Sequence, residues 1–312
     1  MKPVLPVLAA ACACLLSGPA RAADADPAAD RYRSAMQSAR WTGPLLASNA
    51  ETLPKGHFYT EPYFFDVMSG GEHGPGSSGF YQYGLAEGLT IGVQPNFAFG
   101  TRKPNREPAV GDTKLLSQLR LTHFTPDRRV PTVALVVNAT VPTGKFDRLG
   151  QGKAGHGSGS FVPEVGINVQ HYFLLKNDRL LRGRINVLKT SPSGTDVVGR
   201  SVYGTNAGFR GRAKPGSKTT FIAAVEYSLT REWVLAFDVE ADFWGKTKIR
   251  GRDAGGAVVK DTSARSWNVG FAPAVEYNWS DRSGVILGVW VIPKAHNTTS
   301  TVIPAVAYSR FW

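Results

Sequence analysis

Residues 89–100 read LTIGVQPNFAFG, and in this segment every odd position is large and apolar whereas every even position is small or polar. Side chains on a β-strand point to opposite faces with a period of two residues, so the segment predicts a strand with one apolar and one polar face. A tilted strand of about 9–11 residues crosses the apolar layer of a membrane. A half-buried antiparallel strand of a soluble protein alternates in the same way, so one strand does not decide the class.

The same alternation recurs along the chain. The two segments before residue 89 are less regular than the rest. With them, the pattern predicts twelve strands at 57–67, 78–85, 89–100, 114–121, 132–141, 161–173, 181–188, 220–228, 233–243, 267–279, 285–291 and 301–312.

The connections between these strands alternate strictly between short and long. The short ones are 86–88, 125–130, 174–179, 230–232 and 280–282, and the mostly long ones are 68–77, 101–111, 143–160, 189–216, 245–265 and 294–300. Outer-membrane barrels have short periplasmic turns and long external loops, whereas a soluble sandwich has no reason to place every long loop at one end. The sequence therefore predicts an all-β fold, a 12-stranded antiparallel transmembrane β-barrel over residues 56–312.

Aromatic residues near strand ends fit the same architecture. Core packing would explain any one of them, but as a set they indicate the interfacial girdles of a membrane barrel. The chain ends in Phe311 and Trp312, which resembles the C-terminal aromatic signal recognised by the barrel-assembly machinery, although Arg310 interrupts its apolar phase. The residues expected in the girdles are Phe173, Tyr227, Trp233, Trp267 and Trp279.

The N-terminus has the features of a secretory signal. Lys2 precedes an apolar run at 4–16 and an Ala-x-Ala motif that predicts cleavage after Ala22. Both cysteines of the chain lie in this 1–22 segment, so the mature chain has no disulfide and no thiolate metal site. Residues 23–55 are polar and Ala-rich, and we expect them to form a periplasmic N-terminal segment that is partly helical around 30–40.

Residues 41–58 read WTGPLLASNAETLPKGHF, a segment that the barrel pattern does not explain. Together with EPY at 61–63, it resembles a family of bacterial outer-membrane proteins linked to the meta-cleavage pathway of phenol degradation. Further similarity lies in YGL at 83–85, which leads into LTIGVQP at 89–95, and in VPTGK at 141–145. The resemblance covers the N-terminal half of the chain and implies a transporter or channel for aromatic or hydrophobic compounds.

The polar strand faces would line the interior of the barrel. Twelve strands lie between the filled eight-stranded barrel and the open sixteen-stranded channel, so a narrow pore or an internal binding site is expected. Rows of charge set the selectivity of a pore, or the opposite charges could neutralise one another and plug it. No apolar path along the lumen is evident, and the even positions of 89–100 would form a small, uncharged strip with the most room. The candidate selectivity residues are Glu226, Asp238, Glu240, Asp242, Glu276, Lys114, Arg120, Arg182 and Arg184.

The charge of the chain is concentrated in the predicted external loops. The formal net charge is +12, and loops 189–216 and 245–265 each contribute +4. Basic loops on a membrane barrel meet lipid phosphates before nucleic acid, so we expect outer-membrane lipid and lipopolysaccharide as partners. Steering of anionic solutes toward the pore is the alternative use of this charge.

No segment predicts catalysis, a cofactor or a metal site. His156 lies in GHGSG at 155–159, a flexible loop without the strand-to-helix context of a phosphate loop. The leading hypothesis is an outer-membrane channel for small solutes. The alternative is a closed barrel with a structural, adhesive or sensing role, and an outer-membrane lipid hydrolase is the least favoured class because a Ser–His constellation is not evident.

Overall fold

A computed structural model of the protein describes residues 26–100 and 108–312. The predicted signal peptide, its cleavage site and residues 101–107 of one long loop lie outside the described residues. Among the described residues, no helix combines the length and the apolarity needed to cross a bilayer.

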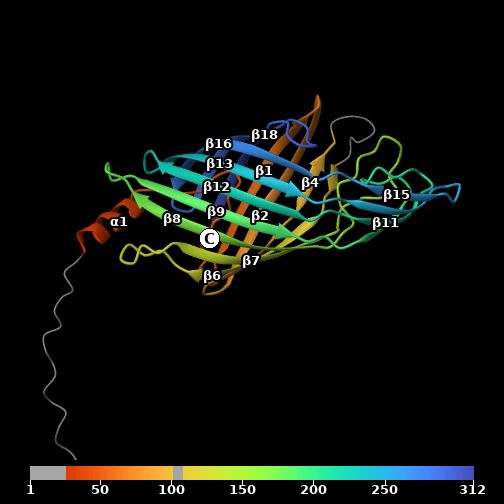
Figure 1. Cartoon of the computed structure of the whole chain (residues 1–312). Helices are drawn as coiled ribbons and strands as arrows, with labels where there is room; N and C mark the ends of the chain where they lie inside the picture. Colours follow the sequence, from red (N-terminus) through yellow and green to blue (C-terminus); the bar gives the residue numbers. More distant parts are fainter. Residues whose placement is uncertain (1–25, 101–107) are drawn as a thin grey trace, which may run out of the picture.

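The described strands close into a twelve-stranded antiparallel barrel (Figure 1). Each strand pairs with its neighbours in sequence, and the first strand pairs with both the second and the last, which closes the sheet. Two strands are each interrupted once, so that β3 and β4 form one and β5 and β6 form another. The barrel strands are β1 (Phe58–Ser69), β2 (Glu72–Ala86), β3 (Leu89–Gln94) with β4 (Asn96–Phe99), β5 (Pro108–Val110) with β6 (Thr113–Thr122), β7 (Thr132–Val141), β8 (Val162–Leu174), β9 (Leu180–Thr190), β12 (Lys218–Ser228), β13 (Trp233–Trp244), β16 (Ser266–Ser280), β17 (Ser283–Ile292) and β18 (Thr301–Phe311).

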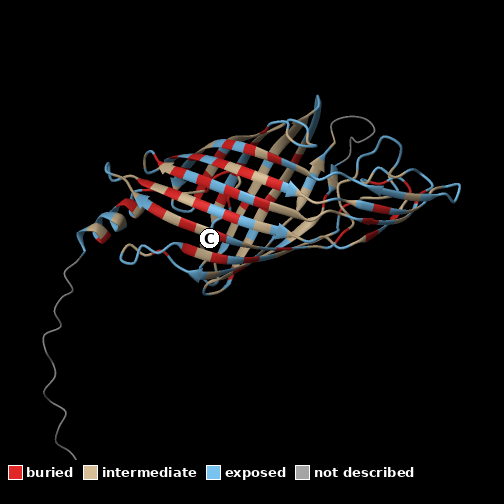
Figure 2. Ribbon diagram, viewed as in Figure 1, coloured by how far each residue is buried: buried red, intermediate tan, exposed pale blue. Residues whose placement is uncertain are grey.

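The alternation read from the sequence is the alternation between the two faces of the barrel wall (Figure 2). Ile91, Val93 and Phe97 are exposed on the outer surface, whereas Thr90 is buried inside. The outer surface is apolar along all barrel strands, which is the surface that a lipid environment requires. The predicted barrel class, its strand number and the lipid-facing phase of 89–100 are confirmed.

One of the expected long connections is wrong. The loop expected at 68–77 is a two-residue turn at Gly70 and Gly71, because β1 and β2 stay paired as far as Ser69 and Glu72. Both glycines have positive φ, +58° and +80°, a backbone conformation that favours glycine. The sequence pattern underestimated these strands because their outer ends, such as 72–79, lack alternating apolar residues.

The long loops contain a second sheet that the sequence analysis did not predict. It has the strand order β10-β11-β14-β15 and projects beyond the end of the barrel (Figure 1). Its strands are only four or five residues long, and the two central ones, β11 and β14, are basic, so the sheet lacks the long apolar alternation that revealed the barrel strands. They are β10 (Thr195–Val198), β11 (Arg210–Lys214), β14 (Lys248–Arg252) and β15 (Val258–Thr262).

The one helix among the described residues, α1 (Pro27–Gln37), packs on the end of the barrel that carries the short turns. Asp26 caps it by accepting the amide hydrogen of Ala28 at 3.0 Å. Ala35 lies in one apolar cluster with Phe124 and Tyr172 of the barrel. The helix expected around 30–40 therefore exists, and it is attached to the barrel by its apolar face.

Candidate functional site

Residues 41–54, which we call the strap, run inside the barrel along its inner wall. They were expected to belong to a periplasmic segment, and for these residues that expectation is wrong. The strap contacts inward side chains of β16, β13, β9, β8, β6 and β3 in this order, so it follows the wall strand by strand. It has no regular secondary structure, and side chains of the wall accept several of its backbone amide hydrogens.

Two of the predicted acidic residues hold the first half of the strap. The Asp238 carboxylate accepts the amide hydrogens of Leu45 at 3.0 Å and Ala47 at 2.9 Å. The Glu276 carboxylate accepts those of Thr42 at 2.6 Å and Gly43 at 3.1 Å. Both carboxylates are fully buried, and backbone amides supply the hydrogen bonds that a buried carboxylate requires.

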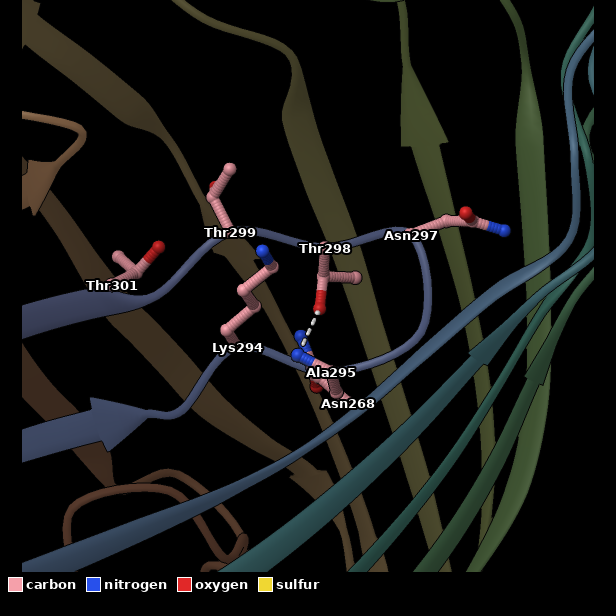
Figure 3. A pocket seen from close by; sticks show the side chains of 7 residues that line it. All are labelled: Asn268, Lys294, Ala295, Asn297, Thr298, Thr299 and Thr301. Carbon is pink, nitrogen blue, oxygen red and sulfur yellow. Dashed lines mark hydrogen bonds between the residues drawn. The ribbon is translucent and has the colours of Figure 1, made fainter.

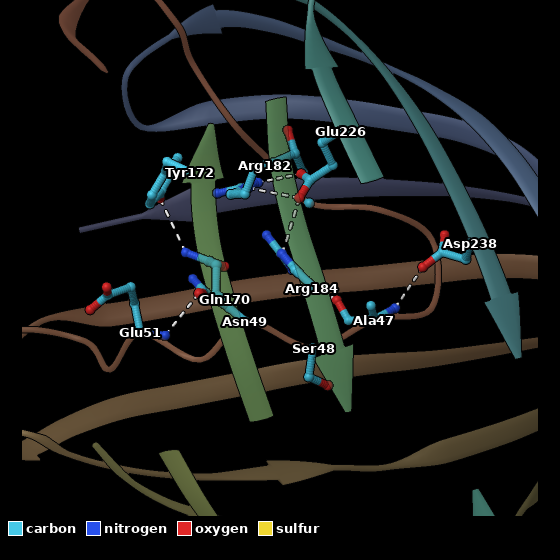
Figure 4. Close-up of polar contacts among 12 residues, drawn as sticks. Ala47, Ser48, Asn49, Glu51, Gln170, Tyr172, Arg182, Arg184, Glu226 and Asp238 are labelled. Carbon is cyan, nitrogen blue, oxygen red and sulfur yellow. Dashed lines mark hydrogen bonds and ion pairs between the residues drawn. The ribbon is translucent and has the colours of Figure 1, made fainter. Parts of the chain in front are cut away.

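The middle of the strap is held by amide and guanidinium groups (Figure 4). Asn186 accepts the amide hydrogen of Ser48 at 2.8 Å and donates to its carbonyl at 3.1 Å. Arg184 donates to the carbonyl of Ala47 at 2.8 Å. These side chains act on the strap as a neighbouring strand would, because they satisfy donor and acceptor together.

Glu51 anchors the second half of the strap. Its carboxylate lies 3.1 Å from Arg120 and 3.0 Å from His123, and it accepts a hydrogen bond from Thr132 at 2.5 Å. Further along, Thr90 accepts the amide hydrogen of Leu53 at 2.8 Å.

A buried ion cluster stands beside the strap. Arg182 makes two hydrogen bonds to the Glu226 carboxylate, and the Arg184 Nε lies 3.0 Å from the same carboxylate. The guanidinium of Arg182 also lies 4.4 Å from the ring centroid of Trp41 in the strap. Thus the predicted acidic and basic walls meet, and here the opposite charges neutralise each other.

The remaining predicted residues also face the interior. Lys114 pairs with Glu164 at 2.7 Å, and Asp242 pairs with Lys218 at 2.8 Å. Glu240 is buried on the same face of β13, between Asp238 and Asp242. Of the nine candidates, Lys114 and Arg120 keep 23% and 25% of their side-chain surface exposed, whereas the other seven are buried.

The strap does not fill the whole interior. Ser48 and Asn49 are exposed although the residues around them contact the wall. On the wall, Gly92, Gln94, Asn96 and Ala98 also keep part of their surface accessible. These four belong to the strip that was expected to leave the most room, whereas Thr90 of that strip is buried against the strap.

An apolar patch on the inner wall was missed by the sequence analysis. Leu45 of the strap packs with Ile286 and Ala272, and partly buried Tyr63, Phe65 and Trp290 complete the cluster. The sequence analysis found no apolar path along the lumen, and this cluster is a local apolar patch on the inner wall. The alternation did not reveal this patch because β1 carries aromatic residues on both faces, with Phe64 on the outer surface at 56% exposure.

A pocket of about 550 Å³ lies at the long-loop end of the barrel (Figure 3). Asn268 of β16 and Lys294 are among its lining residues. Gly270 follows Asn268 on the inward face, and a Cβ on it would lie 2.3 Å from the Trp290 Nε1. Trp290 therefore lies over Gly270, next along the inner wall from the pocket. Its Nε1 is buried and has no hydrogen-bond partner among the described residues.

The barrel is similar to solved outer-membrane structures. It superposes on an outer-membrane channel from Pseudomonas putida F1 with a TM-score of 0.58 and 13% sequence identity, over 86% of this chain and 100% of that chain. The chain has the fold of an outer-membrane β-barrel. A barrel of this fold with an apolar outer surface belongs in the outer membrane.

Two further structures superpose less closely on this outer-membrane barrel. The NanC porin gives a TM-score of 0.48 at 11% identity, over 80% of this chain and 98% of that chain. The toluene transporter TodX from Pseudomonas putida gives 0.41 at 12% identity, over 88% and 95%. No family model and no curated protein matches the chain.

Four of the five predicted girdle residues of the outer-membrane barrel lie exposed on its outer surface near strand ends, and the fifth, Tyr227, is partly exposed. Trp233 packs against Tyr277 with ring centroids 4.6 Å apart, and Trp279 stacks on Tyr308 at 6.0 Å. At the seam, Phe311 lies opposite Tyr59, and the carbonyl of Trp312 accepts the amide hydrogen of Phe58 at 3.3 Å. The C-terminal residues thus close the barrel.

Within residues 26–100 and 108–312, three of the histidines bond through their rings to oxygen atoms. The side-chain hydrogen bonds of His57, His73 and His123 go to backbone or carboxylate oxygens. In the same part of the chain there is no group of three or more His, Cys, Asp or Glu residues that could hold a metal ion.

Proposed function

We propose that the protein is an outer-membrane channel for small solutes, with aromatic or hydrophobic compounds as the solute class. The observation that carries the proposal is the accessible strip on the inner wall, at Gly92, Gln94, Asn96 and Ala98. The residues of the strip are small or uncharged, so a solute that passes along it does not meet a fixed charge. The exposed Ser48 and Asn49 of the strap leave the interior wet.

The apolar patch supports the choice of solute class. Tyr63, Phe65 and Trp290 are partly buried aromatic residues of this patch, and small-molecule sites combine such apolar surface with a few polar groups. Trp290 keeps part of its surface accessible although its Nε1 is buried, so we expect the ring rather than the Nε1 to contact the solute. A link to a phenol meta-cleavage pathway is part of this proposal and rests on the sequence resemblance.

Narrowing the strip tests the channel. We expect Ala98→Trp to reduce single-channel conductance in planar bilayers by more than half, because its side chain would enter the accessible strip. Phe97→Trp is the matched control, since Phe97 is 41% exposed on the outer surface. Equal conductance of the two variants would remove the strip from the pathway, and the absence of current from the wild type would remove the channel.

The solute class is tested by current block. Phenol added to the bilayer chamber should reduce the wild-type current, and Trp290→Ala should weaken this block. Trp233→Ala is the control, because Trp233 lies on the outer surface at 44% exposure. An unchanged block in Trp290→Ala would assign phenol, if it acts at all, to another part of the barrel.

We propose that ion selectivity is set by Lys114 and Arg120, the two charged candidates with accessible side chains. The seven buried candidates would hold the strap and the inner wall instead. Lys114→Gln should shift the cation/anion permeability ratio toward cations. Asp242→Asn, a change at a buried residue of the interior, should shift the ratio less.

A closed barrel with a structural, adhesive or sensing role is the second candidate. The strap favours it, because residues 41–54 are bonded to the wall along their length and occupy much of the interior. In this case the external loops would carry the function and no conductance would appear.

Export and assembly complete the proposal. Residues 1–22 would be removed after Ala22, and the C-terminal Phe311 and Trp312 would be recognised by the barrel-assembly machinery. Replacing both by alanine should lower the amount of folded protein in the outer membrane without changing its amount in whole cells.

A further inference from the structure

The sheet β10-β11-β14-β15 has two chemically different faces. One face is apolar, and its buried Val197, Ala213 and Ile249 pack with Phe146 and Tyr203 from the neighbouring loops. The alternating residues form the other face, which we call the basic face and which is open to solvent. An exposed sheet face with one dominant chemistry is a candidate interaction surface.

The basic face carries seven cations and one carboxylate. Asp196 is that carboxylate, and it lies 3.3 Å from the Nε of Arg212. Asp261 of β15 lies opposite Ile249 and belongs to the other face. The cations are all exposed, and they are Arg210, Arg212, Lys214, Lys248, Arg250, Arg252 and Lys260.

Like charges stand directly opposite one another on this face. Arg210 is in register with Arg252, Arg212 with Arg250, and Lys214 with Lys248. Directly opposed like charges destabilise a sheet, and the single carboxylate on the face cannot neutralise three such pairs. The arrangement therefore favours an external polyanion that would remove this repulsion.

The position of the basic face indicates which polyanion it meets. Phe243 of β13 is paired in register with Trp267 of β16, and both are exposed on the outer surface, so these residues mark the long-loop boundary of the membrane. β14 begins at Lys248, five residues after Phe243, which corresponds to about 16 Å along an extended chain. At this height the cations lie at and above the headgroups of the outer leaflet.

We propose that the basic face binds the phosphate groups of a lipid A-type glycolipid of the outer leaflet. Four of its seven cations are arginines, whose planar guanidinium groups bind phosphate in a bidentate manner. Because the cations are spaced along two neighbouring strands, one headgroup with two phosphates can contact several of them. The inference does not depend on whether the barrel conducts.

Native mass spectrometry of the detergent-solubilised full barrel tests the proposal, with diphosphoryl lipid A as the probe. In Arg210→Gln/Arg212→Gln/Arg250→Gln, we expect the apparent Kd to rise about tenfold at physiological salt, as for the loss of several charge-assisted contacts. The matched control is Arg128→Gln/Lys176→Gln/Arg282→Gln, which removes three exposed cations from the short turns at the opposite end. Its affinity should stay within about twofold of the wild type.

Folding of each variant is checked by its heat-modifiable migration in SDS gels. If the basic-face variant does not fold, two measurements on the wild type still test the proposal. Its affinity for lipid A should fall about tenfold between low and high salt. Binding should be lost when the lipid A is dephosphorylated. Equal affinity of both triple variants and the wild type would overturn the proposal. Salt-independent binding, or equally tight binding of dephosphorylated lipid A, would overturn it too.

Discussion

The carboxylate of Asp238 accepts the backbone amide hydrogen of Leu45 at 3.0 Å, although the two residues are 193 positions apart in the chain. The second oxygen of the same carboxylate accepts the amide hydrogen of Ala47 at 2.9 Å. Asp238 was a candidate selectivity residue, and its carboxylate holds the strap against the inner wall. This contact determines how much of the interior is free.

Removing the Asp238 carboxylate should loosen the strap. Asp238→Ala leaves the amides of Leu45 and Ala47 without their acceptor, a loss of about 1.5–3 kcal/mol for each bond to a charged group. We expect larger or more variable conductance in planar bilayers, because the strap can then leave the wall. Asp196→Ala, which changes a carboxylate of the external sheet, should conduct like the wild type. An Asp238→Ala channel identical to the wild type would mean that the strap is held without this residue.

The buried ion cluster should matter more than a partly exposed one. Glu226→Gln leaves Arg182 and Arg184 in the interior without their counter-charge, and breaking a buried pair costs about 3–5 kcal/mol. Glu164→Gln breaks the pair with Lys114, whose side chain is 23% exposed, so the cost should be smaller. Urea unfolding of the refolded barrels, followed by tryptophan fluorescence, gives both values. A larger loss for Glu164→Gln would contradict the argument from burial.

The end of the strap at Pro54 lies so close to β2 that the strand requires a glycine, Gly84, at this position. A Cβ on Gly84 would lie 2.0 Å from the backbone oxygen of Pro54, so Gly84→Ala must displace the strap or the strand. We expect a loss of about 1–3 kcal/mol in the free energy of unfolding, as for other overpacked sites. In the same strand, a Cβ on Gly74 would meet its nearest atom at 3.6 Å, so Gly74→Ala is the control. Similar urea midpoints for the two variants would count against the close approach.

The junction between α1 and the strap should weaken in acid. Arg40 donates from Nε to Asp281 at 2.6 Å, and this hydrogen bond, aided by the charge of Arg40, holds the pKa of Asp281 below its usual range. A carboxylate with a lowered pKa stabilises the fold above its unfolded pKa of about 3.9, and this contribution is lost as the pH falls through the folded pKa. The urea midpoints of the wild type and Asp281→Asn should differ at pH 6 and converge below about pH 3. A difference that persists in acid would assign the effect to another contact.

The barrel could be predicted because each outward-facing residue contacts lipid directly. Its apolar character therefore does not depend on contacts with distant parts of the chain. Ile91, Val93 and Phe97 had to be apolar wherever the rest of the chain went, since each faces the membrane. The short turns were readable for the same reason, as gaps in that pattern. The pattern failed at 68–77, where β1 and β2 extend beyond the apolar layer and no longer need apolar side chains.

The candidate residues could be found from their position in the period-two alternation, but their hydrogen-bond and ion-pair partners could not. Period-two alternation placed Asp238, Glu240 and Glu276 on the inner face. It said nothing of the strap, because residues 41–54 have no periodicity and their bonds are made by backbone amides. The aromatic patch around Trp290 escaped for a related reason, as its members come from separate strands and from Leu45.

The sequence by itself determined the membrane-facing surface, the number of barrel strands and the set of inward charges, since each depends on alternation along single strands. Only the tertiary structure decided that the inward charges bind the strap and each other, that Thr90 is buried against the strap while Gln94 and Asn96 of the same strip stay accessible, and that the loop cations gather on one sheet face. These features depend on which distant segments meet inside a closed wall. In a confined interior, a buried charge takes the hydrogen-bonding groups that the fold brings to it, and local sequence does not specify them.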